Sequence, residues 1–414
     1  MPDRPTRPKR YEEMTNDSAQ FLKALNLLEA WLVRNHYTGY DPFDGLASFL
    51  RPLTLRKRFL EQVLLQGIRR IPWNLRPVVG IKPHTSPIGM GYLASAYLKL
   101  YSLTKDERYR RNAVSGFEWL INNHSTGYSG YCWGNDFDYT SRGGYLPKGA
   151  PTVVWCSLIG HNFIEGFRLL NEEKYLGIAK SVGDFICTDL PRSSGPGGVC
   201  ISYVCDAQLS IHNSNLLAAG FLAELHKETG HGEYLALATD AVRYSAGAQL
   251  ENGAWYYGEE EKFHWIDNWH TAYDLDSLLE FQRNSGSHEF DMQMLKGLDF
   301  YVRHFFRPDG APKYYWDRDY RFDIQSASQS IDTLLHFATH LTRSDLIELA
   351  KKVAGWTIVN MQDKEGFFYL WKSKWLLNRT PTFHWGGTTM FHALAHLLLT
   401  TDTSRGPHNT PAGS

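Results

Sequence analysis

Side chains able to act as acids, bases or ligands are densest in residues 252–279, NGAWYYGEEEKFHWIDNWHTAYDLDSLL. Within this stretch His270 and Asp274 are one helical turn apart, and a carboxylate four residues from a His can orient the imidazole as a general base. The alternative is structural: Asp267 or Asn268 caps a helix N-terminus, and His270 is a hydrogen-bonded side chain in the first turn. The stretch therefore predicts either a His-based proton-transfer site or an ordinary capped helix.

An imidazole and an amide occupy the corresponding position one repeat earlier, at His212 and Asn213. They could bind a substrate carboxylate or hydroxyl, or simply begin a helix. Glycoside hydrolysis is a different possibility, because it requires two carboxyl groups flanking the bond to be cleaved. Glu259 is one candidate, and the partners considered for it are Asp136, Asp138, Asp267 and Asp317.

Aromatic residues alternate with polar ones in five Gly-containing turns: GYSGYCWG, GGVCISY, NGAWYYG, DGAPKYYW and EGFFYLW. Aromatic rings cover the apolar C–H faces of sugars while a few polar groups pair with the hydroxyls, so this pattern indicates a carbohydrate site. A single aromatic residue could instead fasten its turn to the helix beneath, but the repetition favours a binding surface. The substrate-binding candidates are Trp133, Asp136, Tyr203, Tyr256, Trp316, Gln325, Trp371, His384 and Trp385, together with Asn213, Asp267, Asn268 and Asp274.

An internal repeat indicates which elements position these side chains. Six segments open with small or polar residues and then place apolar residues at three- and four-residue spacing, which is typical of amphipathic or buried helices. They start near Ser86, Pro151, Ile211, Asn268, Asp323 and His384. A second set with one charged face starts near Asn16, Asp106, Glu172, Gly232, Glu289 and Ser344, and is typical of helices exposed on one side.

Six helix pairs of alternating character predict an all-α fold, an (α/α)6 toroid of six inner and six outer helices with short hairpins at one end. An open solenoid is the competing arrangement, and closure is favoured because six pairs close a ring and no capping repeat is evident. The inner N-termini would then share the end that carries the hairpins, so their partial positive charge faces the candidate site. We expect one domain over 16–400, with 37–85 as an elaboration and 1–15 and 401–414 as disordered tails.

The composition argues against several classes of protein. The 414 residues carry 43 Lys and Arg against 44 Asp and Glu, so the basic excess of a nucleic-acid-binding protein is absent. No apolar run approaches the ~20 residues of a membrane span, and the polar, Pro-rich start lacks a signal-peptide core, so we expect a cytoplasmic protein. Five irregularly spaced cysteines predict free thiols. The expected partner is an oligo- or polysaccharide, and no oligomeric state is indicated.

Two patterns receive less weight. His336 and His340, like His392 and His396, have the i,i+4 spacing of metal ligands, but no acidic or Cys ligand accompanies them in the sequence. We therefore expect no metal and no cofactor, and we assign these imidazoles to helix C-termini. The basic amphipathic helix in Arg51–Arg70 could associate weakly with an anionic membrane surface, although an exposed face of a helix bound to the ring is the preferred interpretation.

The stretch QLENGAWYYGEEEKFHWIDNWHTAYDLDSL resembles a family of bacterial proteins associated with exopolysaccharide and capsule biosynthesis, in which a DGSWYYGE-like hairpin precedes an IDNFHTGYNLD-like helix start. The resemblance continues in GYDPFDGL at 39–46, NLRPVVGI at 74–81, SIHNSNLLAA at 210–219 and the Trp-Gly start at 384–387, and it covers about residues 37–400. The family is similar in architecture to uronate-polysaccharide lyases, uronyl C5-epimerases and unsaturated-uronide hydrolases. FHWGGTTM at 383–390 departs from an RWGQAW-like pattern, and the missing Arg weakens a carboxylate-binding role there.

This resemblance implies an enzyme that removes the proton beside a uronate carboxylate, as a lyase or a C5-epimerase does. Such chemistry needs a His or Tyr as base, and Asn, His or Arg contacts that neutralise the carboxylate. The residues that match this inventory are His270, Tyr273, His212 and Asn213. A glycoside hydrolase that uses Glu259 with a second carboxylate is one alternative, and a non-catalytic glycan-binding or assembly protein is another.

Overall fold

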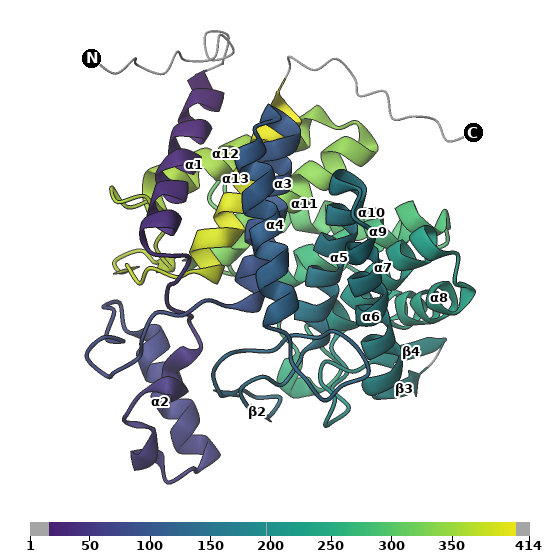
Figure 1. Ribbon diagram of the computed structural model, residues 1–414, viewed down its shortest axis with the longest axis horizontal. Coiled ribbons are helices and arrows are strands. Elements are labelled where there is room, and N and C mark those ends of the chain that lie inside the picture. The colour runs from purple at the N-terminus through teal and green to yellow at the C-terminus, as the bar shows by residue number, and fades with distance from the viewer. Residues whose placement is uncertain (1–15, 196, 403–414) are drawn as a thin grey trace.

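The computed structural model describes residues 16–195 and 197–402 of the chain. Of the tails expected at the two ends, 1–15 and 403–414 lie outside the described residues. The described chain is mostly helical, and its short strands gather at one end of the helices (Figure 1).

The inner helices are nearly identical in length. Five of them have 18 residues: α3 (Pro87–Thr104), α5 (Val153–Leu170), α7 (His212–Thr229), α9 (Asn268–Ser285) and α11 (Ile324–Leu341). The sixth starts with a π-helical turn, η5 (His384–Thr388), and continues as α13 (Thr389–Thr401). Most of their residues are buried, because each of these helices is surrounded by others.

The outer helices bury only one stripe each. They are α1 (Asn16–Arg34), α4 (Glu107–Asn122), α6 (Glu173–Asp189), α8 (Gly232–Gly247), α10 (Asp291–His304) and α12 (Ser344–Met361). In α4, for example, Tyr109, Ala113, Phe117 and Leu120 are buried at the three- and four-residue spacing of one helix face.

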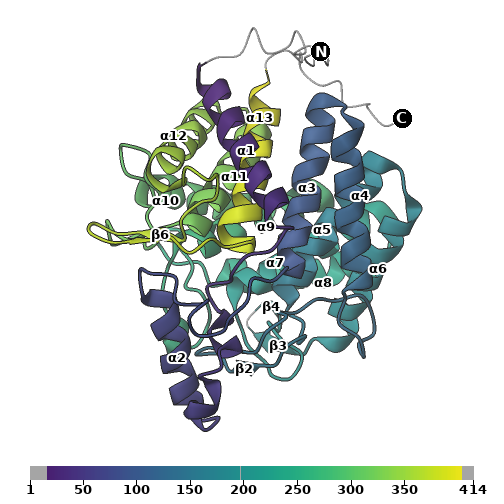
Figure 2. The ribbon, with the colours of Figure 1, turned by 60° about the vertical axis from the view of Figure 1, so that its left-hand side comes forward.

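The inner helices form a closed ring. Each contacts the next along the chain, and α13 contacts α3, so the last inner helix meets the first. This closure confirms the expected (α/α)6 toroid and excludes the open solenoid (Figure 2).

The connections from outer to inner helices carry all the strands. Two antiparallel hairpins pair β1 (Tyr139–Thr140) with β2 (Tyr145–Leu146), and β3 (Arg192–Gly195) with β4 (Gly198–Ile201). A three-stranded sheet contains β5 (Phe322–Asp323), β6 (Trp371–Lys372) and β7 (Leu377–Asn378). The turn before α9 forms isolated bridges instead, such as Ile211 with Gly258, so the expected hairpins occur only in part.

At the opposite end the chain turns sharply from inner to outer helices. The C-caps of α7 and α9 are Gly230 and Gly286, with φ of 74° and 69°. Glycine adopts this left-handed conformation without the clash that a Cβ atom would cause, which lets the next helix begin within two to five residues.

Residues 37–85 form an elaboration beyond the hairpin end of the ring (Figures 1 and 2). It contains η2 (Asp44–Ala47), η3 (Arg51–Thr54) and α2 (Arg58–Arg70). A buried ion pair, Arg76 Nε to Asp44 Oδ1 at 2.7 Å, holds its base together.

None of the helices in the described ranges is both long and apolar enough to cross a membrane. The five cysteines are free, and Cys132, Cys156 and Cys200 are buried.

Candidate active site

A cavity of about 800 Å³ opens at the end of the ring where the inner helices begin. Its walls come from the N-terminal turns of all six inner helices, from the connections before them, and from the 37–85 elaboration. Fourteen of the lining residues are Phe, Tyr or Trp. A cavity of this size with aromatic walls and a few polar groups is typical of a small-molecule or glycan site.

Nine of the catalytic and substrate-binding candidates line this cavity, and so does Asp317, which was considered as a partner for Glu259: the nine are His270, Tyr273, Asn213, Tyr203, Tyr256, Trp316, Gln325, His384 and Trp385. They come from the starts of four inner helices and the connections before them, so the ring brings together positions up to 182 residues apart in the chain.

His270 and Asp267 form an oriented pair at the start of α9. Asp267 is the N-cap residue, and its Oδ1 accepts the His270 backbone N–H at 3.1 Å. Its Oδ2 accepts from His270 Nδ1 at 2.7 Å and from Trp265 Nε1 at 2.9 Å. Because the Asp267 carboxyl oxygens act here as acceptors of three N–H groups, Nδ1 of His270 is the donor in this pair and Nε2 is left with its lone pair.

The sequence suggested Asp274 as the partner of His270, and this was wrong. Side chains on a helix lean toward its N-terminus, so the His270 ring reaches the cap carboxylate rather than a residue one turn further on. Asp274 is instead buried with its Oδ1 unpaired, and burial raises its pKa well above the usual range.

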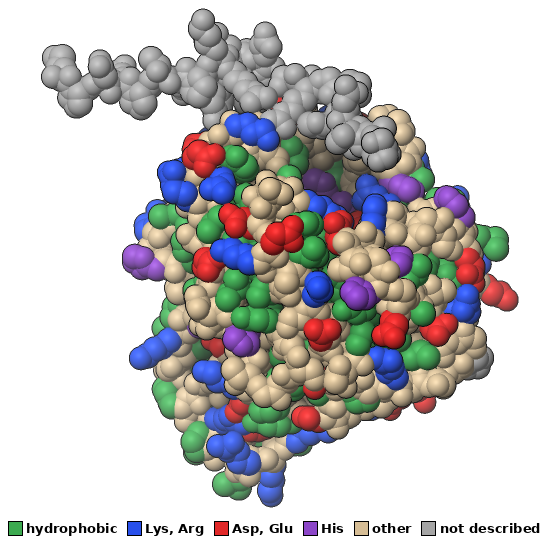
Figure 3. Space-filling view, turned by 45° about the vertical axis from the view of Figure 1, so that its right-hand side comes forward, with side chains coloured by type: hydrophobic (Ala, Val, Ile, Leu, Met, Phe, Trp, Pro, Cys, Tyr) green, Lys and Arg blue, Asp and Glu red, His purple; other side chains and the backbone are tan. Residues whose placement is uncertain are grey.

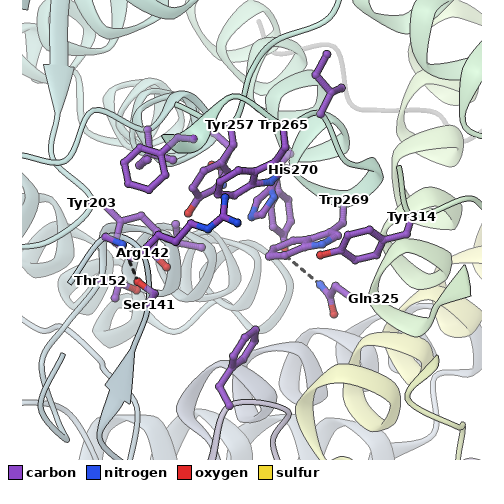
Figure 4. Close-up of a pocket in the computed structure, with 18 of the residues that line it drawn as sticks. Ser141, Arg142, Thr152, Tyr203, Tyr257, Trp265, Trp269, His270, Tyr314 and Gln325 are labelled. Atoms are coloured by element: carbon purple, nitrogen blue, oxygen red, sulfur yellow. Dashed lines mark hydrogen bonds between the residues drawn. The ribbon is translucent and has the colours of Figure 1, made fainter. Parts of the chain in front are cut away.

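Aromatic rings enclose the His270 imidazole. Its ring centroid lies 3.6 Å from that of Trp269 and 4.4 Å from that of Tyr257, and Tyr257 stacks on Trp265 at 4.5 Å. Figure 4 shows these four side chains grouped on one wall of the cavity. Trp269 is half-buried and forms part of the cavity wall.

Tyr273 lies one turn further along α9 and belongs to a buried hydrogen-bond chain. Its hydroxyl lies 3.0 Å from the Tyr92 hydroxyl and accepts from Gln325 Nε2 at 3.2 Å. Burial raises the pKa of Tyr273 to about 12. The phenol therefore keeps its proton at neutral pH and can donate a hydrogen bond, which disfavours the role of base that the family resemblance left open for it.

A second imidazole, His384, enters the cavity from the π-helical turn η5. Single π-helical turns occur frequently at functional sites. Burial lowers the pKa of His384 to about 3, so this ring is neutral at physiological pH. Asp41, which also lines the cavity, places its Oδ2 4.0 Å from His384 Nδ1, and burial raises the pKa of Asp41 to about 7.

The cavity walls carry more positive than negative side chains. The four cations are Arg69, Arg70, Arg142 and Arg318, and the two carboxyl groups are Asp41 and Asp317. Arg142 follows strand β1, and its side chain extends toward Tyr257 and Trp265 (Figure 4). Such a distribution favours a ligand with negative charge.

Several polar atoms on the cavity walls are buried and have no hydrogen-bond partner among the described residues. They are Asn213 Oδ1, Trp269 Nε1, Gln325 Oε1 and His384 Nδ1. Buried polar atoms are normally paired, because leaving one unpaired is costly. A ligand with several hydroxyl or amide groups would supply the missing donors and acceptors.

Two candidate catalysts lie outside the cavity. His212 is buried in the first turn of α7 with its Nε2 3.5 Å from Glu259 Oε1, and burial lowers its pKa. Neither residue is part of the cavity wall, since the backbone of His212 pairs with Tyr257 and turns its ring away toward Ser245. Asn268 is also absent from the wall, and its Oδ1 accepts from Tyr301 and Ser330.

Three further candidates are part of the scaffold around the site. Trp133 is fully buried, and its Nε1 donates to the Leu120 carbonyl at 3.0 Å, which matches the alternative that such residues fasten turns to helices. Asp136 lies 2.9 Å from His84, and Trp371 is buried in β6. None of the three lines the cavity.

Other wall residues were missed in the sequence because they lie outside the repeat. Asp41, Arg69 and Arg70 belong to the 37–85 elaboration, and Arg142 to the β1–β2 hairpin. The signal for Asp41 was the GYDPFDGL motif, which was noted for its resemblance but not assigned a role.

Deeper in the ring, the expectation that the paired imidazoles lack acidic partners was wrong for His336, His392 and His396. Asp332 of α11 contacts both His392 and His396 of α13 at 2.9 Å, and Asp276 of α9 contacts His336 at 3.2 Å. The sequence could not show this, because the carboxylates come from neighbouring helices. Within 16–195 and 197–402, no group of three or more His, Cys, Asp and Glu is arranged to hold a metal ion.

No protein-family model matches the sequence, and no curated protein matches it. The fold, however, is shared with solved structures of carbohydrate-active enzymes. The cellobiose 2-epimerase of Bacillus thermoamylovorans has a TM-score of 0.62 at 10% identity, with 77% of this chain and 90% of that chain covered. An unsaturated glucuronyl hydrolase specific for heparin has a TM-score of 0.62 at 11% identity, with 92% and 97% covered.

A D-mannose isomerase has a TM-score of 0.58 at 12% identity, over 76% of this chain and 86% of that chain. These similarities define the class of fold: this chain is an (α/α)6 toroid like those of epimerases, isomerases and glycoside hydrolases. At such identities they identify the architecture and leave the activity to be argued from the site.

Proposed function

We propose that this protein is a carbohydrate-active enzyme that transfers a proton at a carbon atom of a sugar bound in the cavity. The observation that carries this proposal is the Asp267–His270 pair, with Nδ1 held at 2.7 Å and Nε2 left free of any protein partner in the described chain. An imidazole in a fixed tautomer within an aromatic cavity is a suitable general base.

The carbanion formed by proton removal must be stabilised on a neighbouring oxygen. The Tyr273 hydroxyl already accepts from Gln325, so its own proton can be donated to such an oxygen. The high pKa of Tyr273 keeps that proton in place at neutral pH. A preorganised donor of this kind stabilises developing negative charge.

The four wall arginines favour a sugar that carries a carboxylate, a uronic acid. A guanidinium group pairs with a carboxylate through two parallel hydrogen bonds, which would neutralise its charge and make the adjacent C–H more acidic. In this proposal the wall arginines, Arg142 among them, bind the substrate carboxylate, which is the role that the sequence suggested for His212 and Asn213.

Epimerisation differs from elimination in that the carbanion is protonated again from the other face. His384 and Asp41 supply a second proton-transfer group on the cavity wall, from an inner helix separated from α9 by α11. This second group favours a C5-epimerase over a lyase. The fold similarity to a cellobiose 2-epimerase and a D-mannose isomerase supports the same class of reaction.

A glycoside hydrolase is the second candidate. It is favoured by Asp41, whose pKa of about 7 would let one carboxyl stay protonated while Asp317 on the same wall is a possible second carboxyl group. Of the carboxylates suggested by the sequence for this chemistry, only Asp317 lines the cavity, and Glu259 does not.

The test is incubation with uronic-acid oligosaccharides in deuterated water. Solvent deuterium at C5 without cleavage would support the epimerase, whereas an ultraviolet-absorbing unsaturated product would identify a lyase. New reducing ends without unsaturation would support the hydrolase. Binding without any of these products would contradict an enzymatic role and favour a glycan-binding protein.

A further inference from the structure

Exposed apolar side chains are concentrated in one small part of the molecule. Among 18 large hydrophobic residues exposed in the described chain, eight lie between residues 49 and 78: Phe49, Leu53, Leu55, Phe59, Leu60, Val63, Trp73 and Val78. Leu53, Leu55 and Phe59 are 75%, 71% and 73% exposed. Single exposed apolar residues are normal, but a cluster of this kind marks an interaction surface.

The same segment is strongly basic, although the whole chain is nearly neutral. Residues 47–82 contain eight Lys and Arg against one Glu, whereas the rest of the chain contains 35 against 43. The one acid, Glu61, is buried and paired with Arg51 at 2.9 Å, so it does not offset the exposed charge. The lower tip of the space-filling view, at the level of α2 in Figure 1, shows basic and hydrophobic side chains side by side (Figure 3).

Both properties meet in the turn that joins η3 to α2. In PLTLRKRFL, residues 52–60, every residue except Thr54 is exposed. The cations Arg56, Lys57 and Arg58 are thus flanked on both sides by exposed Leu and Phe. We call residues 52–60 the basic-apolar tip.

The basic-apolar tip is held firmly in place. Arg58 Nη2 and Gln62 Nε2 donate to the Ser141 carbonyl at 2.7 Å and 2.8 Å. Arg51 also pairs with Asp138 of the β1–β2 connection. The tip is therefore a fixed projection of the toroid at its cavity end and not a loose loop.

We propose that the basic-apolar tip docks this protein on an anionic lipid bilayer. Apolar side chains flanked by Lys and Arg match the interface of such a bilayer, where the side chains enter the acyl boundary and the cations meet anionic headgroups. A second copy of the chain fits less well, because a symmetric contact would place two strongly positive tips together. Nucleic acid would leave the exposed Leu side chains of the tip, Leu53, Leu55 and Leu60, without a suitable partner.

The geometry also connects the bilayer to the cavity. Helix α2 has 13 residues and is therefore about 20 Å long, shorter than the ~30 Å hydrocarbon core, so it can lie on a bilayer but not cross it. Its first residues belong to the basic-apolar tip, whereas Gln66, Arg69 and Arg70 near its end line the cavity. A docked molecule would thus hold its cavity within a helix length of the headgroups, where a membrane-attached glycan is presented. The docking itself does not depend on the reaction proposed above.

The experiment is co-sedimentation of the full chain with vesicles of phosphatidylcholine alone or with about 30 mol% phosphatidylglycerol. We expect binding to the anionic vesicles that is at least tenfold stronger than to the neutral ones. It should weaken when salt is raised from about 0.1 M to about 1 M, because the screening length falls from ~10 Å to ~3 Å.

Two variants separate the contributions of charge and apolar surface. R56E/K57E reverses two exposed charges, and L53S/F59S removes two exposed apolar side chains; each should reduce binding at least tenfold. The matched control K23E/K180E reverses two exposed charges on the outer helices α1 and α6 and should bind like the unaltered chain. Circular dichroism and thermal unfolding check that all three variants are folded.

Absence of binding to anionic vesicles would overturn the proposal, and so would equal loss in K23E/K180E, which would reduce the effect to net charge. Light scattering tests the alternative that the tip binds a second copy of the chain. A dimer that L53S/F59S converts to a monomer would support that alternative and overturn the proposal. Vesicle binding measured without any sugar leaves the test independent of the proposed epimerase activity.

Discussion

His–Asp pairs occur both at the cavity end of the ring, where the inner helices begin, and deeper among the inner helices. The pairs differ in the groups that surround them. At the hairpin end, Asp267 holds His270 Nδ1 at 2.7 Å; deeper in the ring, Asp332 holds His392 Nδ1 at 2.9 Å. The other nitrogen of His392 lies 3.2 Å from Ser95 Oγ, whereas the other nitrogen of His270 faces the cavity. The distance between the imidazole and its carboxylate therefore does not distinguish a candidate base from a structural imidazole. The distinguishing feature is whether the second ring nitrogen contacts a protein group or faces the cavity.

The neighbouring polar groups repeat this difference. Four buried atoms on the cavity wall lack partners, whereas Asp276 accepts from Gln329, Thr333 and His336 at 2.7, 2.8 and 3.2 Å. The end of the molecule below the chain termini is hollowed, with His and basic side chains visible inside (Figure 3). Asp276 and Asp332, deeper in the ring, are paired by side chains of neighbouring helices and so join helices to one another, while the cavity wall retains unpaired groups for a ligand.

Removal of His270 should have the largest effect on turnover. We expect His270→Ala to lower kcat/KM by about 10³-fold, since a general base contributes 10²–10⁴-fold. Thermal unfolding should change little, because the ring is partly exposed to the cavity and Asp267 still caps α9. Unaltered turnover in this variant would remove His270 from the mechanism.

The converse is expected for Asp332, whose two imidazole partners hold its pKa well below the usual range although burial opposes this. Asp332→Ala leaves the Nδ1 atoms of two imidazoles without their acceptor and should destabilise the fold by about 3 kcal/mol, since each buried donor left unpaired costs about 1–3 kcal/mol. Turnover per folded molecule should remain within a few-fold of the unaltered enzyme. Denaturant unfolding and kcat measured on the same sample test the comparison, and a large loss of kcat with full stability would contradict it.

Asp267→Asn tests orientation without removing the base. Asn is as good an N-cap as Asp, so α9 should remain intact. The amide cannot hold the proton on Nδ1 in the same way, and the imidazole can adopt the other tautomer, with its lone pair turned away from the cavity. We expect kcat to fall by about 10²-fold with little change in KM. A rise in KM at constant kcat would instead indicate that Asp267 supports substrate binding.

The ring itself was predictable because its signals are local. Helix periodicity repeats six times, and closure follows from that number. Asp267 as the cap and His270 in the first turn were both recognised in one stretch. The partner of His270 was wrong because side-chain direction, and not spacing, decides between Asp267 and Asp274. Asp41 and Arg142 were missed because their contribution depends on how segments outside the repeat fold back over the ring, and the partners of His392 and His396 come from another helix.

The smallest expected effect concerns the free energy of unfolding at acidic pH. The cavity wall and the region deeper in the ring each contribute one buried neutral imidazole to it. Burial lowers the pKa of His396 to about 4 and that of His384 to about 3. In the unfolded chain a His titrates near pH 6.5, so below this pH the unfolded state binds a proton that the folded state does not. The contribution of each neutral imidazole to the free energy of unfolding is therefore fully present above about pH 6.5. It is lost as the pH decreases toward 4, with a slope of at most about 1.4 kcal/mol per pH unit for each imidazole.

His396→Asn and His384→Asn should each flatten this slope when the free energy of unfolding is measured between pH 6.5 and 4. The variant-minus-parent difference is the relevant quantity, because the raised pKa values of His161 and His336 act with the opposite sign in the parent. Only His384→Asn should also lower turnover at neutral pH, since His384 lines the cavity and His396 does not. Equal turnover in the two variants would show that His384, like His396, has only a structural role. His270 would then act without a second imidazole.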